Sequence, residues 1–482
     1  MYIRKVFIEN IRSITNFQID FGENPAGWHV LIGDNGSGKS TVLKAISLCL
    51  NNFIDLPALR EDLSSWVKNG EADGVVILLF KPTPDAPPAY LDDYQLTGDY
   101  QQLSDNINTR YDWHKAPIKQ LYFGGNTRKT PKIKPDLNKP ELFGDDTPTE
   151  NKFKTVASPG GIFSYSMEHD RIFRGEKVEQ IVLDIRYMIG VYESFSAGYG
   201  PFRRFTGGNA EKEQIYKVNP RLGAHLSLFG EDVALSEAIP FITGMYIKKL
   251  EGKSEGKYFL SFIDFINKSG LLPHGTQIDK VDSEGVVFKD GNGLEIDIFQ
   301  MSDGYRSVLS LTFDLIRQLT RFYGTETVFR DLEKNNYTIL LPGVVLIDEV
   351  DAHLHPTWQT RIGFWFTKFF PQIQFIVTTH SPLICRASEQ GSIWRLAAPG
   401  SGQPSGEITG TDKDKLIFGN ILDAYGTEVF GQQVARSESS QHKMERLATL
   451  SVKSSFGKLN QEEKKELKYL RKILTTDDET QF

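Results

Sequence analysis

The residues with the clearest chemistry form a glycine-rich segment, Gly33–Thr41, with the sequence GDNGSGKST. The segment fits the pattern G-x-x-x-x-G-K-[ST] and stands between an apolar strand pattern at 29–32 and a helical pattern that runs to Leu50. Glycines there permit a loop whose backbone N–H groups surround phosphate oxygens, and the next helix presents its positive end. A coincidental glycine turn is the alternative, and the strand–loop–helix context disfavours it. The expected nucleotide-binding residues are Gly33, Asp34, Asn35, Gly36, Ser37, Gly38, Lys39, Ser40 and Thr41.

Within this segment two side chains have specific expected roles. Lys39 is expected to reach the β- and γ-phosphates and so to act in catalysis, and Ser40 is expected to bind Mg²⁺. The segment therefore predicts a site for ATP with Mg²⁺.

Two adjacent carboxylates, Asp348 and Glu349, follow the apolar run Val344–Ile347. A continuous run of this kind predicts a strand buried on both faces of a sheet. The carboxyl end of such a strand delivers side chains to the edge where α/β sheets bind ligands. We expect Asp348 to hold Mg²⁺, directly or through water, and Glu349 to polarise the attacking water. The alternative, a polar entry into a loop, is disfavoured by the glycine loop upstream.

A third apolar run, Phe375–Val377, ends in Thr378-Thr379-His380. His380 could donate to the γ-phosphate or to the attacking water, although a histidine at a strand end is more often structural. Its place just after the carboxylate strand favours the catalytic interpretation. The nearby pair His353 and His355 lacks a third or fourth ligand in the sequence around it, so we interpret both as structural.

The composition fits a globular protein of a reducing compartment. The 482 residues are 39% apolar and 24% charged, a balance that can bury a core. Both cysteines, Cys49 and Cys385, stand in apolar segments and suit core positions, not a disulfide or a metal site. No signal-peptide pattern and no apolar run near the ~20 residues of a membrane span is present, so we expect a cytoplasmic protein without a membrane partner.

The charge of the chain does not decide whether it binds DNA. The net charge of −7 is not that of a typical nucleic-acid binder. Residues 110–139 nevertheless carry eight Lys/Arg, two acids and several aromatic rings, a mixture that can track phosphates and stack bases. The competing interpretation is a solvated insertion.

The hydrophobic patterns divide the chain into four parts. We predict an N-terminal lobe with the glycine loop at 1–95, an insertion and helical region at 96–275, a C-terminal lobe with the carboxylate strand at 276–398, and a linker and helical tail at 399–482. Alternation over 6–21 predicts two strands, and 278–299 predicts a small β-meander.

With these motifs in chain order, the segment Gln300–Ser307 (QMSDGYRS) resembles a divergent ABC signature in the S-D-G form. The chain thereby resembles the RecF/SMC/OLD-like branch of ABC-type ATPases, which often carry AAA family names. The resemblance implies an α/β head with a mixed or parallel sheet, an N-terminal β subdomain, an inserted helical and loop region and a short helical C-terminal tail. It adds Ser302, Asp303 and Gly304 to the nucleotide contacts, and Ser302 also suits the N-cap of the next helix.

The resemblance extends to two further positions. Asp351 falls in the stretch similar to the Walker B and D-loop motifs, and Arg12 occupies the N-terminal strand turn where a basic residue touches nucleotide. The Q-loop glutamine of the family is not identified. Arg203 and Arg204 stand near its place, where they could face phosphate or decorate a loop.

What the resemblance implies is Mg²⁺-dependent hydrolysis of ATP at sites shared between two copies. Residues 33–41 of one copy would face 302–304 of the other in a homodimer or a higher even oligomer with composite ATP sites. ATP would close the dimer and hydrolysis would open it.

Two features of other members of this family are not found in the sequence, which limits the members that the chain can resemble. No heptad arms separate the glycine loop from the signature, and little chain remains for a Toprim domain after His380. The make-up resembles the ATPase subunits of bacterial antiphage systems such as Septu, partnered by an HNH nuclease, and PARIS. This implies control of a separate effector, a nuclease (HNH or Toprim type) or a toxin. The alternatives are a RecF-like DNA-binding clamp acting in repair, for which 110–139 is the discriminating segment, and an ATP-dependent scaffold with slow turnover.

Overall fold

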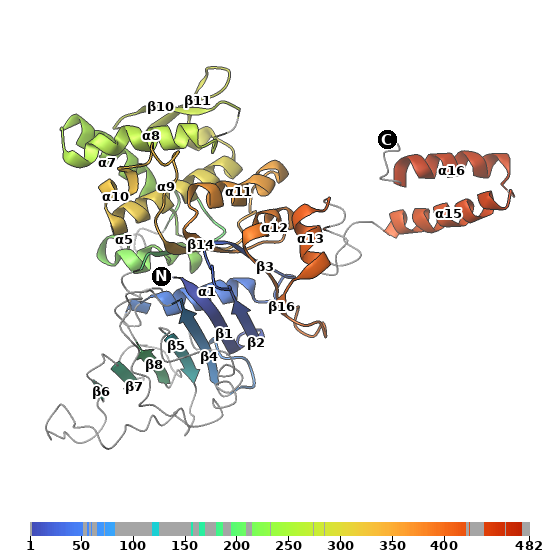
Figure 1. Ribbon diagram of the computed structural model, residues 1–482, viewed down its shortest axis with the longest axis horizontal. Helices are drawn as coiled ribbons and strands as arrows, with labels where there is room; N and C mark the ends of the chain where they lie inside the picture. Colours follow the sequence, from blue (N-terminus) through green and yellow to red (C-terminus); the bar gives the residue numbers. More distant parts are fainter. Residues whose placement is uncertain are drawn as a thin grey trace. The chain divides into compact units, whose positions relative to one another are not determined.

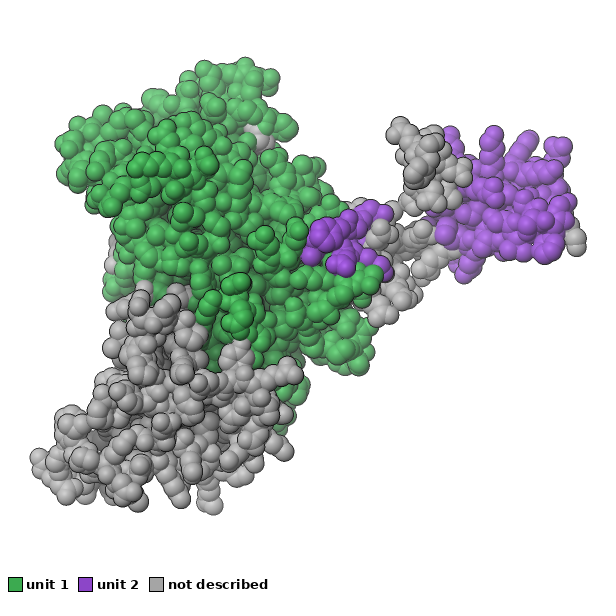
Figure 2. All heavy atoms as spheres, viewed as in Figure 1, with its two compact units in different colours: residues 1–413 green, residues 414–482 purple. Residues whose placement is uncertain are grey.

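The computed structural model describes most of the chain, in two compact units, Met1–Lys413 and Asp414–Phe482 (Figure 2). The described residues are 2–51, 55–56, 59, 65–71, 73–81, 118–124, 156–157, 163–168, 180–186, 194–208, 215–231, 233–272, 274–283, 285–420, 424, 438–457 and 459–474. For the strands between 118 and 186 the description covers the backbone. Among the described residues, no helix is long and apolar enough to cross a membrane.

A six-stranded sheet forms the centre of the first unit and carries the predicted apolar runs (Figure 1). Its strand order is β16-β15-β3-β14-β13-β9, and all neighbours are parallel except the pair of β15 with β16. The strands are β3 Gly27–Ile32, β9 Ser196–Tyr199, β13 Gly343–Ile347, β14 Ile373–Thr378, β15 Ile393–Arg395 and β16 Gly406–Glu407. Every residue of β13 and β14 is buried, as continuous apolar runs predict.

Helices cover both faces of this sheet. Helix α1, Lys39–Leu50, contributes to one core with Leu346 and Ile376. On the other side lies α11, Pro356–Phe369, whose Phe366 stacks on Trp28 of β3. Short helices complete the chain path of the first unit: α5 Ile215–Val218, α6 Pro220–Gly223, η5 Leu226–Leu228, α12 Pro382–Cys385 and η8 Arg386–Gln390. Helix α13, Gly410–Phe418, contains the boundary between the two units.

A second, antiparallel sheet lies against the other side of α1 (Figure 1). Its seven strands have the order β2-β1-β4-β5-β8-β7-β6. They are β1 Ile3–Ile11, β2 Ile14–Asp20, β4 Asp73–Phe80, β5 Ile118–Gly124, β6 Val156–Ala157, β7 Phe163–Glu168 and β8 Gln180–Arg186. The predicted N-terminal β subdomain is confirmed. It also extends further than expected, because β5 to β8 come from the region predicted as a helical and loop insertion.

The helical lobe follows β9 and ends with α10, just after α9, the helix that the signature segment opens. It contains α7 Ala238–Leu250, η6 Ser254–Tyr258, α8 Phe259–Lys268, η7 Ile298–Gln300, α9 Asp303–Tyr323 and α10 Thr325–Phe329. Phe262 of α8 packs between Phe313 of α9 and Phe329 of α10. The predicted β-meander is present as β10 Gln277–Val281, β11 Val286–Lys289 and β12 Glu295–Asp297.

The second unit contains a helical hairpin. Helix α15, Glu438–Ser455, packs on α16, Gln461–Leu474, through four buried leucines. Arg446 and Glu466 form an ion pair between the two helices. The helical C-terminal end is therefore as predicted, and α15 adds a partner helix for it. The first unit is thus an α/β fold in which α1 lies between a mostly parallel sheet and an antiparallel sheet, as expected for the fold class.

Candidate nucleotide-binding site

The candidate site lies at the carboxyl edge of the six-stranded sheet. The glycine loop follows β3, the carboxylates follow β13, and Thr379 and His380 follow β14. Because these strands are parallel neighbours, their carboxyl ends meet at one edge. The fold thus brings together three segments that the sequence places over a span of more than 300 residues.

The loop itself needs its glycines. Gly33, Gly36 and Gly38 all have positive φ angles, of 153°, 78° and 104°. A Cβ on Gly33 would lie 2.3 Å from the carbonyl oxygen of Leu396, which follows β15. A Cβ on Gly38 would lie 2.9 Å from Ser13 Oγ in the β1–β2 turn. Side chains at these positions would force the loop off its neighbours, so the motif is sterically required here.

Lys39 begins α1 and is buried in the loop. Its Nζ donates hydrogen bonds to the carbonyl oxygens of Gly33, at 2.8 Å, and Asp34, at 3.0 Å. Burial lowers the pKa of the ammonium, while Asp348 and Glu349 act in the opposite direction and favour its charged form. A buried cation held by two carbonyls at a helix N-terminus is an environment suited to a phosphate.

Ser40 and Asp348 meet across the two elements. Ser40 Oγ on α1 donates to Asp348 Oδ1, at the end of β13, over 3.1 Å. One carboxylate and one hydroxyl are oxygen ligands of the kind Mg²⁺ combines with substrate phosphates and water. These two residues would hold Mg²⁺, which would neutralise phosphate charge. Among the described residues, no group of three or more His, Cys, Asp or Glu side chains could hold a metal ion.

A threonine that we did not single out from the sequence organises both carboxylate residues. Thr378, the last residue of β14, is fully buried and donates its hydroxyl to Asp348 Oδ1. The same Oγ1 accepts the backbone N–H of Glu349 at 2.7 Å. Glu349 has φ of 44°, a left-handed conformation that a non-glycine residue keeps only when its surroundings enforce it. One hydroxyl therefore holds the Asp348 carboxylate and the backbone of Glu349.

The other predicted residues of this edge lie close by. Thr379 Oγ1 donates to Asp351 Oδ1 at 2.6 Å, which places Asp351 beside the end of β14. His380 is exposed at the same edge, directly after the buried Thr379. Its catalytic role stays a prediction. His355 caps α11 by accepting the N–H of Thr357, which fits the structural role expected for it.

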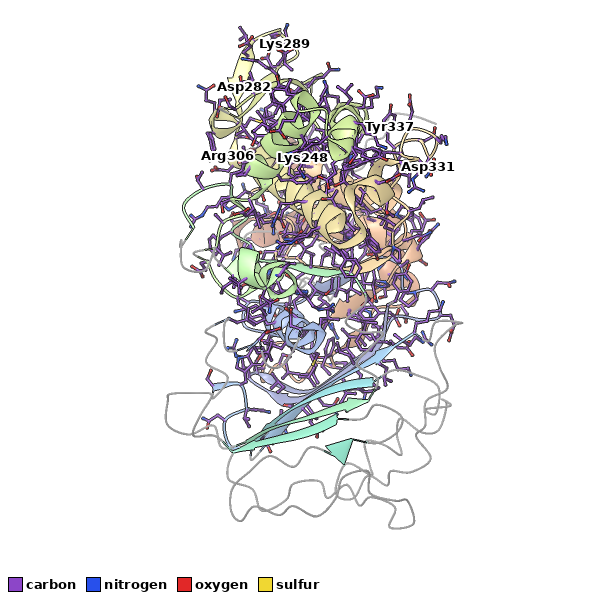
Figure 3. All side chains as sticks on the ribbon, turned by 90° about the vertical axis from the view of Figure 1, so that its left-hand side faces the viewer. Lys248, Asp282, Lys289, Arg306, Asp331 and Tyr337 are labelled. Carbon is purple, nitrogen blue, oxygen red and sulfur yellow. The ribbon has the colours of Figure 1, made fainter. Side chains whose placement is uncertain are left out.

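The signature segment opens α9 at an exposed position. Ser302 is the N-cap of α9, as expected, with an extended backbone and no side-chain capping hydrogen bond. Asp303 is exposed and forms an ion pair with Arg306, which Figure 3 labels. A Cβ on Gly304 would lie 2.7 Å from the carbonyl oxygen of His353, so the signature adjoins the turn after Asp351.

Arg12 lies in the turn between β1 and β2, with φ of 50°. Its guanidinium stacks over the Trp66 ring at 4.6 Å. The neighbouring Ser13 borders Gly38, so the turn adjoins the glycine loop. Contact of Arg12 with nucleotide stays a prediction.

The two arginines near the expected Q-loop have different positions. Arg203 is buried and donates to backbone carbonyls of the turn that follows β13, so its guanidinium does not face a phosphate site. Arg204 donates to the carbonyl oxygens of Gly207 and Glu231. The adjacent glycines and proline in 198–202 were the only sequence signal, and they gave no hint of this difference.

His225 is a further buried residue that the sequence did not reveal. Its two ring nitrogens lie 2.9 Å from Ser47 Oγ on α1 and 3.0 Å from Ser196 Oγ on β9. It therefore links the helix behind the glycine loop to the strand that precedes Arg203. No local pattern around His225 could have shown it.

Comparison with known proteins supports the ATPase interpretation. Residues 1–81 match the family model described as "AAA ATPase domain", and residues 208–386 match the model described as "AAA domain, putative AbiEii toxin, Type IV TA system". The chain is 41% identical to the Retron Ec83 probable ATPase of Escherichia coli over 108 residues, 22% of this chain and 18% of that protein. It is 25% identical to the Retron Vc95 probable ATPase of Vibrio cholerae serotype O1 biovar El Tor, over 76% of this chain and 68% of that protein.

A third relative is the Septu protein PtuA of Bacillus mycoides (strain KBAB4), 22% identical over 81% of this chain and 40% of that protein. The chain thus spans less than half the length of two of these three relatives. Among solved structures, an SMC head bound to the C-winged helix domain of ScpA has a TM-score of 0.40 and 16% identity, covering 85% of this chain and 98% of that one. The expected resemblance to ABC-type ATPases of antiphage systems is confirmed.

Proposed function

We propose that this AAA-type P-loop ATPase hydrolyses ATP with Mg²⁺ and uses the cycle to control a separate effector, a nuclease or a toxin, in antiphage defence. The observation that carries the proposal is the direct contact of Ser40 with Asp348. It joins a phosphate-binding loop to a carboxylate turn 308 positions away. Such a pairing supplies both parts that phosphoryl transfer needs, a phosphate cradle and a place for the metal.

Each residue of the site has a role in ATP binding or hydrolysis that follows from its position. Lys39 leaves its loop carbonyls to bind the β- and γ-phosphates, and the N–H groups at the start of α1 bind phosphate oxygens. Glu349, held by Thr378, orients the attacking water, and His380 donates from the open side of the edge. Mg²⁺, when held by Ser40 and Asp348, supplies charge neutralisation at the phosphates.

The exposed signature supports a dimer as the acting form. Ser302 and Asp303 are exposed on the first unit, where a second copy of the chain can reach them. In a two-fold dimer, 302–304 of each copy would complete the nucleotide site of the other. ATP binding would favour the closed dimer and hydrolysis would release it, which gives the effector two states to follow.

Steady-state turnover is the first test. The purified chain should hydrolyse ATP in the presence of Mg²⁺, and Lys39→Ala should set the background. Turnover no higher than that background, with or without double-stranded DNA, would refute hydrolysis by the isolated chain.

The same assay separates control of an effector from a DNA-repair clamp. Strong stimulation by double-stranded DNA would favour the clamp, or a sensor triggered by DNA. Turnover indifferent to DNA would favour a controller that awaits a protein partner. The basic segment 110–139 lies outside the described residues except for the backbone of β5, so its role rests on the sequence. Recovery of a nuclease or toxin with the tagged protein from its native host is the direct test of effector control.

A further inference from the structure

A single buried arginine bridges two elements of the candidate site. Arg203 follows β9 and is 5% exposed. Its Nε donates to Ser307 Oγ at 3.1 Å, and Nη1 donates to the carbonyl oxygens of Gly200, at 2.9 Å, and Asp348, at 2.8 Å. Nη2 donates to the carbonyl oxygens of Glu349, at 3.0 Å, and Val350, at 3.4 Å. A guanidinium has five N–H donors, and all five are used here.

Three of these acceptors are consecutive carbonyls of the turn that carries both carboxylates. Asp348, Glu349 and Val350 turn their carbonyl oxygens toward one planar group, which fixes the peptide orientation on either side of Glu349. Thr378 holds the same turn through the Glu349 N–H. The left-handed backbone of Glu349 is thus enforced by Arg203 through carbonyls and by Thr378 through an N–H.

The remaining hydrogen bond of Arg203, to Ser307 Oγ, connects it to α9, the helix that the signature segment opens. Ser307 lies on α9, one helical turn after Asp303. Gly304, in the same first turn, lies so close to the segment after the carboxylate turn that a Cβ there would be 2.7 Å from the carbonyl oxygen of His353. The start of α9 is therefore attached to segment 348–353 at two points, one polar and one by close packing.

Charge supports the same arrangement. Burial lowers the pKa of Arg203 to about 10, and Asp348 is the largest of the influences that favour its charged form. The guanidinium therefore stays protonated at neutral pH. The permanent positive charge of Arg203 beside this turn is opposite in sign to the charges of the Asp348 and Glu349 carboxylates that the turn carries.

We propose that Arg203 is a positioning residue of the ATPase reaction. It fixes the backbone on both sides of Glu349 and so orients the Glu349 carboxylate. Through its hydrogen bond to Ser307 it also couples the carboxylate turn to α9, so that the turn and the helix shift together. The inference rests on the proposed hydrolysis. It adds that a displacement of α9, such as contact with a second copy would cause, reaches Glu349 through this arginine.

The chain offers a matched control at the next position. Lysine keeps the charge but has three donors around one point, so Arg203→Lys cannot hold three carbonyls and a hydroxyl together. Arg204→Lys makes the same chemical change at a neighbour whose guanidinium donates to the carbonyl oxygens of Gly207 and Glu231, away from the carboxylate turn. Ser307→Ala removes the one bond to α9 and leaves the other four.

The test is steady-state turnover of the full chain over a range of ATP concentrations, with Lys39→Ala as background and a thermal melt of each variant. We expect Arg203→Lys to lower kcat about tenfold or more and to keep KM within about threefold of the wild-type value. The reason is that a misplaced Glu349 carboxylate slows the reaction without affecting ATP binding. Ser307→Ala should lower kcat by about threefold, and Arg204→Lys should stay within about twofold of wild type.

Each contrary result has one meaning. An Arg203→Lys kcat close to that of Arg204→Lys overturns the positioning role. If Arg203→Lys instead unfolds or loses kcat and ATP binding together, Ser307→Ala decides: an unchanged kcat overturns the coupling to α9, and a lowered kcat at unchanged KM supports it. Wild-type turnover no higher than Lys39→Ala removes the proposed hydrolysis, and this inference falls with it. That failure is distinct from an active wild type with an equally active Arg203→Lys.

Discussion

The buried hydroxyl of Thr378 gives the sharpest prediction, because one substitution removes it without changing the side-chain shape. Thr378→Val leaves the Glu349 N–H without an acceptor and removes a donor from Asp348. An unpaired buried donor costs about 1–3 kcal/mol, and a hydrogen bond to a charged group contributes about 1.5–3 kcal/mol. Allowing about 1 kcal/mol in return for the added apolar group, the net loss is about 1.5–5 kcal/mol.

Thr378→Ser is the matched variant. It keeps the hydroxyl and loses one methyl group, which costs about 1 kcal/mol including the small cavity. The melting temperature of a unit of this size shifts by about 1 °C per kcal/mol, so Thr378→Val should melt about 0.5–4 °C below Thr378→Ser.

Activity should separate the two variants more clearly than stability. If half of the lost free energy is missing in the transition state, kcat of Thr378→Val falls about tenfold, whereas Thr378→Ser stays within about threefold of wild type. Thermal melts and steady-state turnover of both proteins measure this. Equal melting temperatures and equal kcat for the valine and serine variants would refute the reasoning that the hydroxyl orients the carboxylate turn.

Three further predictions concern other parts of the first unit. ATP with Mg²⁺ at 100 times Kd should stabilise the wild type by about 2.7 kcal/mol, which raises its melting temperature by about 3 °C. Lys39→Ala should lose this increase in a thermal melt, and an increase that persists would show that Lys39 does not bind phosphate. Glu349→Gln should bind ATP without hydrolysing it and accumulate as a dimer in light scattering, and a variant that stays monomeric with ATP would contradict the composite site. His29, whose pKa burial lowers to about 4, stays neutral in the folded state while the unfolded chain takes up a proton below its usual 6.5. Stability should therefore fall by up to about 3 kcal/mol as the pH drops from about 6.5 to about 4, and His29→Gln should flatten that slope in denaturant titrations.

Part of the site could be predicted because its chemistry depends on adjacent residues. The conformation of a phosphate loop requires glycines at fixed offsets, so Gly33, Gly38 and Lys39 identify it in the sequence alone. The apolar run before Asp348 likewise predicts a buried strand with carboxylates at its end. Ser302 is likewise at the expected N-cap of α9, although its hydroxyl makes no capping bond.

The pairing of distant segments was decided by tertiary structure. The antiparallel sheet runs through β5 to β8, where the sequence predicted helices and loops, because strand pairing over long separations has no signature in a short window. Arg203 is 145 positions from Asp348 and 104 from Ser307, and Thr378 is 29 from Glu349. Each of these roles consists of hydrogen bonds whose partners are remote in the chain. The sequence by itself therefore determined which chemistry this protein carries, and the fold decided which residues hold that chemistry in place, since only folding brings a donor to its acceptor.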